Sequence, residues 1–245
     1  LMIRRQPRST PSNSSAASDV YKRQQIYLFV DIDGHNHTYV DLGSEEINQS
    51  IIKSYDNVWK ELVNQTTIIH VSSGNPALNK KILKIRRDLS LKIPVSFDVG
   101  NDIFFHDEKY LREILNETTF LFMNEFEFGH LNGILHLHEP TDIFNFAGNI
   151  KALSIVYKNR RVELYTKDRK YCLPKIKNML EDFTGTSDAY VSGFIAGYLK
   201  GFDYIRSMAL GQILMIYIGS KLGAQTCVPT WESVQEQLEK YIEGG

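Results

Sequence analysis

Residues 182–188, DFTGTSD, place small and polar side chains directly in front of an apolar run with a helical pattern. This pattern predicts a helix that begins at about Gly185. The first turn of a helix has unpaired backbone N–H groups and the positive end of the helix dipole, so the amides of Thr186, Ser187 and Asp188 can converge on an anion such as a phosphoryl group. The simpler interpretation is a helix N-cap, because Gly, Ser, Thr and Asp are ordinary cap residues.

The helix behind this segment carries Ala189, Gly193 and Gly197 at four-residue intervals. Residues at this spacing lie on one face of a helix, so that face is almost without side chains. We expect it to lie close against a neighbouring backbone. Such packing would determine where Asp188 points.

Asn124 and Glu127 directly follow an apolar run that is predicted to be a strand. A carboxylate and an amide at the carboxyl end of a strand can meet hydrated Mg²⁺, which prefers oxygen ligands and keeps several of its waters. The alternative is that the two residues cap the helix that follows.

Three ordered segments resemble motifs of the ribokinase-like (PfkB) family of sugar and nucleoside kinases. DFTGTSDAYVSGF at 182–194 is similar to the family's DTxGAGD followed by AFxxGF, NEFE at 124–127 matches NxxE, and GAQTCVP at 223–229 matches the closing GAQxxVP. The resemblance covers essentially all of residues 25–242. It implies a three-layer αβα fold with a mainly parallel sheet.

The resemblance also implies an activity, namely ATP-dependent transfer of phosphate to a primary hydroxyl of a sugar or nucleoside. ATP and Mg²⁺ would be the cofactors, while K⁺ binding and a homodimer are left open. The residue roles carried over are the catalytic base Asp188, the anion hole of Gly185, Thr186 and Ser187, the magnesium and phosphate residues Asn124 and Glu127, the monovalent-cation residue Asp182, and the nucleotide-binding residues Gln212 and Gly223.

The chain departs from the family pattern at two places. Ser187 replaces a glycine of GAGD, and Lys158 and Arg161 stand where the family's TxGxxG has glycines that accompany nucleotide contacts. These departures keep open an alternative function, a non-catalytic relative that binds nucleotide or sugar. Gln212 is equally compatible with a satisfied polar residue on a core helix.

Two further patterns admit other chemistry. Asp31 and Asp33 after an apolar run look like the nucleophile strand of haloacid-dehalogenase phosphatases, but a second strand follows where that family needs a loop and helix, so a hairpin of 25–33 and 38–42 is favoured. His130, His136 and His138, with Glu139, invite a metal site. Histidine pairs near a loop that contains proline are more often surface residues, and no third ligand that converges with such a pair can be placed, so no directly ligated metal is expected.

Strand and helix patterns alternate along the rest of the chain, which predicts a parallel sheet covered on both faces. The expected strands are 67–71, 94–98, 119–123, 150–156 and 162–165, and the expected helices are 44–63, 79–89, 108–115, 185–199, 204–220 and 231–242.

Residues 1–24 resemble translated adapter sequence of DNA sequencing libraries, and we expect a disordered, non-native head that packs against nothing, followed by a kinase domain at 25–245. Without this head the chain has 23 basic and 28 acidic residues, a net charge of −5, which argues against a nucleic-acid partner.

The two cysteines predict no disulfide framework. Apolar runs are too short to span a bilayer, so a cytoplasmic protein is expected.

The match corresponds to the carboxyl two-thirds of the family pattern. The early strands, much of the lid and a substrate-binding Asp of the family have no counterpart here, so the acceptor cannot be named from the sequence. We also expect residues 25–245 alone not to turn over substrate.

Overall fold

The computed structural model of the chain describes residues 2–4, 25–30, 36–41, 54–72, 76–100, 103, 106–174 and 180–243. For the first three ranges and for residues 242–243 it describes the backbone alone.

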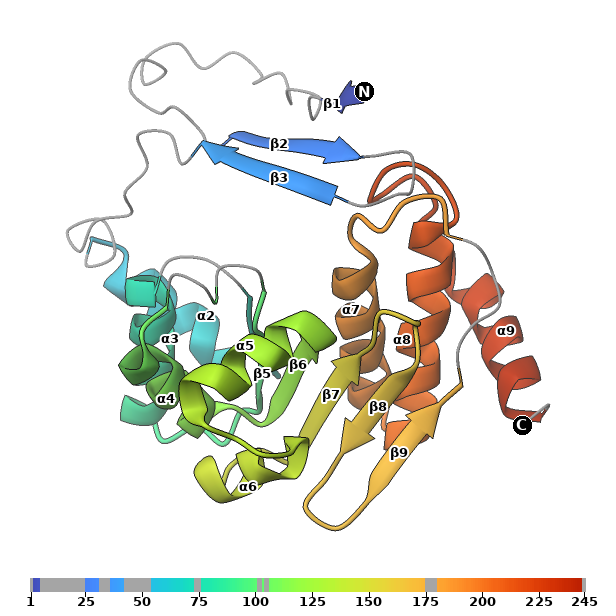
Figure 1. Cartoon of the computed structure of the whole chain (residues 1–245). Coiled ribbons are helices and arrows are strands. Elements are labelled where there is room, and N and C mark those ends of the chain that lie inside the picture. Colours follow the sequence, from blue (N-terminus) through green and yellow to red (C-terminus); the bar gives the residue numbers. More distant parts are fainter. Residues whose placement is uncertain are drawn as a thin grey trace.

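Six strands form the main sheet in the order β4-β5-β6-β7-β8-β9 (Figure 1). The first four run parallel, and β8 and β9 are added antiparallel at one edge. The strands are β4 Ile69–Val71, β5 Val95–Asp98, β6 Phe120–Asn124, β7 Ala152–Val156, β8 Val162–Tyr165 and β9 Lys170–Leu173. The predicted, mainly parallel sheet is confirmed.

Helices cover both faces of this sheet, which gives the predicted three-layer αβα architecture (Figure 1). On one face lie α2 Asp56–Asn64, α3 Pro76–Asp88, α4 Glu108–Glu117, α5 Glu125–Leu135, the 3₁₀ turn η2 Pro140–Asp142 and α6 Ile143–Phe146. On the other face lie α7 Thr186–Leu199, α8 Tyr204–Gly219 and α9 Trp231–Glu243.

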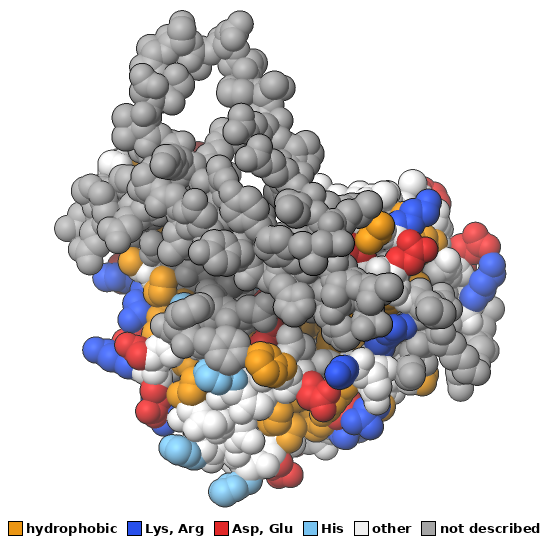
Figure 2. Space-filling model, turned by 45° about the horizontal axis from the view of Figure 1, so that its top comes forward, with side chains coloured by type: hydrophobic (Ala, Val, Ile, Leu, Met, Phe, Trp, Pro, Cys, Tyr) orange, Lys and Arg blue, Asp and Glu red, His pale blue; other side chains and the backbone are white. Residues whose placement is uncertain are grey.

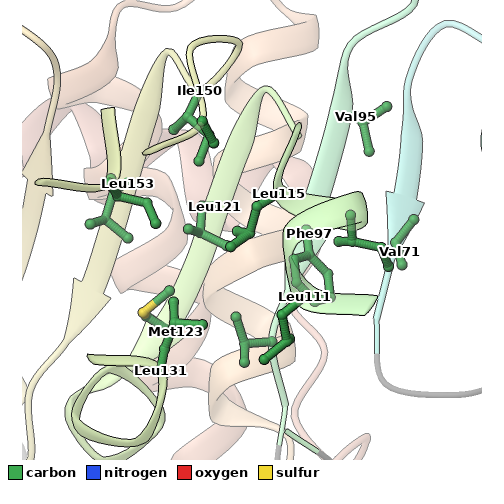
Figure 3. Packing of buried hydrophobic residues seen from close by; sticks show 14 of the residues in the cluster. Val71, Val95, Phe97, Leu111, Leu115, Leu121, Met123, Leu131, Ile150 and Leu153 are labelled. Carbon is green, nitrogen blue, oxygen red and sulfur yellow. The ribbon is translucent and has the colours of Figure 1, made fainter. Parts of the chain in front are cut away.

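The side chains of strand β6 contribute to the hydrophobic cores on both faces of the sheet. Leu121 and Met123 pack into the core beneath α4 and α5, as Figure 3 shows, whereas Phe120 and Phe122 pack into the core beneath α7 and α8. Successive side chains of a strand point to opposite faces, so a strand buried on both sides reads as a continuous apolar run.

The sequence did not predict β9. Its four residues alternate exposed and partly buried positions at the edge of the sheet, and only Leu173 is fully buried. A strand this short, with one buried side chain, leaves no apolar periodicity to detect.

The hairpin predicted near the amino terminus is confirmed. Strands β2 Gln25–Val30 and β3 Asn36–Asp41 pair antiparallel, while Asp31, Asp33 and the rest of the turn lie outside the described residues. The structure also places Met2–Arg4 as β1, paired antiparallel with β2. This pairing departs from the expectation of a head that packs against nothing, whereas residues 5–24 lie outside the described part and the division at residue 24 stays a prediction.

On the described part of the face in Figure 2, Lys and Arg side chains are interspersed with Asp and Glu side chains, so no continuous basic surface forms there. No helix within the described ranges has the length and apolar character needed to cross a membrane.

Candidate active site

Several residues singled out in the sequence meet in one hollow at the carboxyl ends of β5 and β6. Asn124, Glu127 and Ser187 line it together with Asp98, although Ser187 belongs to α7 and the others to the sheet and α5. The remaining lining residues are Phe122, Met123, Ser154, Val156, Tyr190 and Val191. The carboxyl ends of parallel strands are where α/β proteins build their ligand sites.

Helix α7 begins next to this hollow, with Gly185 as its N-cap in a left-handed conformation, φ +78°. The Thr186 amide donates to the Phe183 carbonyl oxygen at 3.2 Å, so it is already engaged inside the loop. The amides of Ser187 and Asp188 belong to the first turn, where a helix offers its N–H groups no internal acceptor. The Thr186 amide is therefore engaged within the loop, and the anion-binding roles of Gly185, Thr186 and Ser187 stay a prediction.

The loop in front of α7 is held by Asp182, whose side chain is 3% exposed. One carboxylate oxygen accepts from the Thr184 amide at 2.9 Å, and the other accepts from the Gly223 amide at 2.8 Å. Gly185 is pressed against the same second loop, because a Cβ on it would lie 2.9 Å from the Ala224 Cβ. The segments 182–188 and 223–226, predicted separately to bind phosphate and nucleotide, are thus one connected structure.

Helix α7 also packs closely against α8, with no room for a side chain at two of its glycines. A Cβ on Gly193 would lie 2.6 Å from the Gly211 Cα, and one on Gly197 would lie 2.9 Å from the Ser207 Cα. The expectation that the small-residue face lies against a neighbouring backbone is confirmed.

The opposite side of α7 is tied to the sheet. The Tyr190 hydroxyl, which is fully buried, lies 2.7 Å from the Ser154 hydroxyl on β7. Burial without a charged partner raises the pKa of Tyr190 far above its usual value, so it stays a neutral hydrogen-bonding phenol. Asp188, two residues earlier, remains exposed on a helix whose position is fixed from both sides.

Asn124 and Glu127 form a reciprocal capping box at the start of α5. The Asn124 Oδ1 accepts from the Glu127 amide, and the Glu127 Oε2 accepts from the Asn124 amide, both at 2.8 Å. Asn124 and Glu127 therefore cap α5, as the alternative in the sequence analysis predicted. Capping does not remove the pair from the hollow, because Glu127 is 6% exposed and both residues line it.

Asp98 is the site residue that the sequence argument missed. It ends β5, is 9% exposed, and lines the hollow beside Asn124 and Glu127. Its position as the last, polar residue of a buried strand in a parallel sheet is the signal that could have found it. Two buried carboxylates and an amide supply the hard oxygen atoms that suit a partly hydrated Mg²⁺.

Gln212 lies deep in the core rather than on the surface of the site. It is 0% exposed. Its amide nitrogen donates to the Pro174 carbonyl at 2.9 Å and the Arg160 carbonyl at 3.3 Å, while its oxygen accepts from the Tyr241 hydroxyl at 2.9 Å. These partners satisfy most of the amide, so a nucleotide contact by Gln212 stays a prediction and would require exchanging one of them.

The positions where the family pattern has glycines lie in and beside the β7–β8 turn. The Lys158 amide donates to a Glu125 carboxylate oxygen at 3.1 Å, and the Arg161 guanidinium lies 3.2 Å from the Glu163 carboxylate. Arg161 also stacks on the Tyr157 ring, 4.6 Å from its centroid. Side-chain contacts therefore stabilise the β7–β8 turn, in place of the glycines of the family pattern.

The histidines at 130–138 do not gather into a metal centre within the described ranges, where no three His, Cys, Asp or Glu side chains converge. His136 has a structural position, since it ends α5 in a left-handed conformation with φ +55°.

Comparison with known proteins places this architecture in a defined group. Residues 21–231 match the family model described as pfkB family carbohydrate kinase. The chain is 31% identical over 225 residues to a nucleoside kinase of Methanocaldococcus jannaschii, covering 91% of this chain and 70% of that protein. The crystal structure of the M. jannaschii nucleoside kinase, a member of the ribokinase family, superposes with a TM-score of 0.71 over 89% of this chain and 68% of that one.

Two more distant structures share the fold. A Burkholderia thailandensis nucleoside kinase in complex with inosine has a TM-score of 0.76 at 19% identity, covering 90% of this chain and 69% of that one. A ribokinase II homologue from Escherichia coli, in complex with ATP and Mg²⁺, has a TM-score of 0.70 at 16% identity, covering 89% of this chain and 70% of that one.

Proposed function

Because the chain belongs to the pfkB family of carbohydrate kinases, we propose that it transfers the γ-phosphate of ATP to a hydroxyl group of a nucleoside. The predicted class of activity, an ATP-dependent kinase of sugars or nucleosides, is confirmed by this membership. The choice of a nucleoside is supported by the M. jannaschii nucleoside kinase, which is similar over 91% of this chain.

One observation carries the proposal: Ser187, in the first turn of α7 next to Asp188, lines one hollow with Asp98 and the Asn124–Glu127 pair, which is distant in sequence. A kinase has little covalent chemistry to perform and works by positioning its reactants and stabilising charge. A helix N-terminus facing oxygen ligands provides both an anion site and a cation site in one place.

In this mechanism Asp188 accepts the proton of the acceptor hydroxyl as that oxygen attacks the γ-phosphorus, while the bond from the γ-phosphorus to the β–γ bridging oxygen breaks and ADP leaves. The Ser187 and Asp188 amides donate hydrogen bonds to the charge that develops on the transferring group. Asp98, Asn124 and Glu127 would hold Mg²⁺, partly through water, and the ion would neutralise charge on the phosphates.

The connected loops 182–188 and 223–226 extend the proposal to the nucleotide. The Gly223 backbone, at φ +102°, would lie against the nucleotide, and Gln212 would take part only by rearranging its present bonds. Asp182, whose carboxylate is held in place by the Thr184 and Gly223 amides, would contribute an oxygen ligand to a K⁺ site.

Replacing Asp188 by Asn tests the catalytic role, because the change keeps shape and removes proton acceptance. In the purified protein, ATP consumption with a nucleoside panel should fall by about 10² to 10⁴ while ATP affinity changes little. Asp203→Asn is the matched control, since Asp203 caps α8 through the Arg206 amide and lies outside the hollow. An Asp188→Asn enzyme as fast as its parent would remove Asp188 from the mechanism.

The alternative of a non-catalytic relative draws on one feature, the Ser187 side chain where the family pattern has glycine. A parent protein that binds ATP and nucleoside without consuming ATP, and that gains turnover on Ser187→Gly, would favour this alternative.

A further inference from the structure

The turn between β7 and β8, residues 157–161, lies at the carboxyl end of β7, beside the hollow (Figure 1). Val156, the last residue of β7, is itself one of the lining residues. The Arg160 amide donates to the Tyr157 carbonyl at 2.7 Å, which closes the turn. Three of the five residues in the turn are basic, namely Lys158, Arg160 and Arg161. A short basic segment therefore stands at the edge of the sheet where the candidate site is built.

Hydrogen bonds tie this turn to helices on both faces of the sheet. The Lys158 amide donates to the carboxylate of Glu125, the residue between Asn124 and the rest of the first turn of α5, at 3.1 Å. On the other face, the Gln212 side chain of α8 donates to the Arg160 carbonyl at 3.3 Å. The backbone of the turn is therefore fixed relative to both the α5 and the α8 side of the site.

The Arg160 side chain extends over the loop in front of α7. Its guanidinium carbon lies 5.5 Å from the centroid of the Phe183 ring. The Phe183 carbonyl accepts a hydrogen bond from the hydroxyl of Thr186, the first residue of α7, at 2.8 Å. Arg160 is partly buried, so its side chain is held by its surroundings rather than extended into solvent. Its positive charge thus lies on the loop that leads into the N-terminus of α7.

The neighbouring arginine, Arg161, belongs to the opposite face of the sheet. Its guanidinium lies 3.2 Å from the Glu163 carboxylate and stacks on the Tyr157 ring. Glu163 is the register partner of Ile155, whose side chain is part of the core on the side of α4 and α5, and register partners share one face of a sheet. Of the two adjacent arginines, Arg161 therefore pairs with a buried carboxylate, and Arg160 faces the layer of α7.

The position of Arg160 favours an anion between its guanidinium and α7. A cation beside the start of a helix is unfavourable, because the helix N-terminus is the positive end of the dipole. An anion that meets both groups stabilises both. A guanidinium presents its N–H donors in a planar fork that matches the oxygens of a phosphate group, and a chain of phosphates is long enough to reach a helix terminus and a side chain together.

We propose that Arg160 binds the phosphate chain of the nucleoside triphosphate at the phosphates that stay on the leaving nucleotide, while the first turn of α7 holds the transferring group. In this role Arg160 positions the triphosphate and offsets the charge that the leaving nucleotide gains when its bond to the γ-phosphorus breaks. This inference rests on the proposed function and adds to it a nucleotide-binding side chain.

The contact is tested first by binding, without turnover. Arg160→Met keeps an apolar side chain against Phe183 and removes the charged fork. In calorimetric titrations of the purified protein, this change should raise the Kd for ATP and for inorganic tripolyphosphate by about 10- to 100-fold. Tripolyphosphate carries the phosphate chain without base or sugar, so a loss shared by both ligands locates the contact at the phosphates.

Arg169→Met is the matched control for the loss of one positive charge. Arg169 is exposed in the turn between β8 and β9, at the opposite end of these strands, so both Kd values should stay parental. If Arg169→Met weakens tripolyphosphate binding as much as Arg160→Met does, the effect belongs to net charge and the proposal is overturned.

Steady-state kinetics separate phosphate binding from a purely structural role. Arg160→Met should raise the KM for ATP while the KM for the nucleoside and the Tm stay close to the parental values. Equal rises in both KM values together with a lower Tm would make Arg160 a structural residue and overturn the proposal. Arg160→Lys covers the case in which Arg160→Met is poorly folded. It keeps the charge but lacks the fork, so its Kd for tripolyphosphate should lie between those of the parent and Arg160→Met.

The role of Arg160 and the proposed function fail in different ways. If the parent consumes ATP in the presence of a nucleoside while Arg160→Met and Arg160→Lys keep the parental Kd for ATP and tripolyphosphate, the role of Arg160 is wrong and the proposed function stands. If the parent binds neither ATP nor tripolyphosphate, the proposed function fails, and the role of Arg160 fails with it.

Discussion

The contact between α7 and α8 gives the sharpest stability prediction. Gly193→Ala adds one methyl group that would sit 2.6 Å from the Gly211 Cα and 2.9 Å from the Gly211 nitrogen. Ordinary van der Waals contact needs 3.4–4 Å, and both obstructing atoms are backbone, so no rotamer change relieves the clash. The two helices must move apart by about 1 Å in a close-packed interior.

The expected cost follows from two opposing effects. Overpacking a core typically costs about 1–3 kcal/mol, and a backbone obstacle favours the upper end. Replacing a glycine by alanine within a helix, in contrast, stabilises the fold by about 0.5–1 kcal/mol, because alanine has the higher helix propensity. The free energy of unfolding should therefore fall by about 2 kcal/mol, which corresponds to a drop of roughly 4–8 °C in Tm for a chain of this size.

Gly133→Ala in α5 is a matched control with the same chemical change. A Cβ at Gly133 meets no heavy atom within 4 Å, so only the gain in helix propensity remains and stability should rise by about 0.5–1 kcal/mol. Urea and thermal unfolding of the two purified variants and their parent measure both effects. A Gly193→Ala protein as stable as the Gly133→Ala protein would refute the close approach of α7 and α8.

Three further predictions concern charged side chains. Asp182→Asn can no longer accept hydrogen bonds from both backbone amides, those of Thr184 and Gly223. The free energy of unfolding in urea should therefore fall by about 1.5–3 kcal/mol. An unchanged free energy would mean that these bonds do not hold the two loops together. Glu127→Gln can still form the capping box with Asn124, so Tm should stay within a few degrees of the parental value. The Mg²⁺ concentration needed for half-maximal activity should rise. If that concentration is unchanged, Glu127 acts only as a helix cap. Burial alone would raise the pKa of Glu163, but hydrogen bonds and the charge of Lys170 hold this pKa below the usual 4.5. Ionised Glu163 therefore stabilises the fold above pH 4.5, and this contribution is lost as the pH falls below that value. The urea midpoint should fall less on acidification in Glu163→Gln than in the parent.

Much of the fold could be predicted because its signals are local. The apolar run at 119–123 corresponds to β6, which is buried on both faces. The four-residue spacing of Ala189, Gly193 and Gly197 predicted a close backbone contact, which α7 makes with α8. These signals survive in a sequence because a side chain's face follows from its number along a strand or helix.

The candidate site was predicted less completely. Asn124 and Glu127 line one hollow with Ser187, and they also form the helix cap that the sequence offered as their alternative role. The sequence could not show that both arrangements occur together. It also left Gln212 open between a nucleotide contact and a satisfied polar residue on a core helix, and the structure encloses its amide among Pro174, Arg160 and Tyr241. Which atoms a polar side chain meets depends on segments far away in the chain.

By itself, the sequence determined the order and type of most elements, the αβα class, and a kinase-like spacing of three motifs. Only the tertiary structure decided that 182–188 and 223–226 form one loop system through Asp182, and that Asp98 joins Asn124 and Glu127. The physical reason is that periodicity and caps are set by neighbours along the chain. A ligand site, in contrast, is made where strand ends and a helix start converge, and that convergence is created only when the sheet pairs and the helices pack upon it.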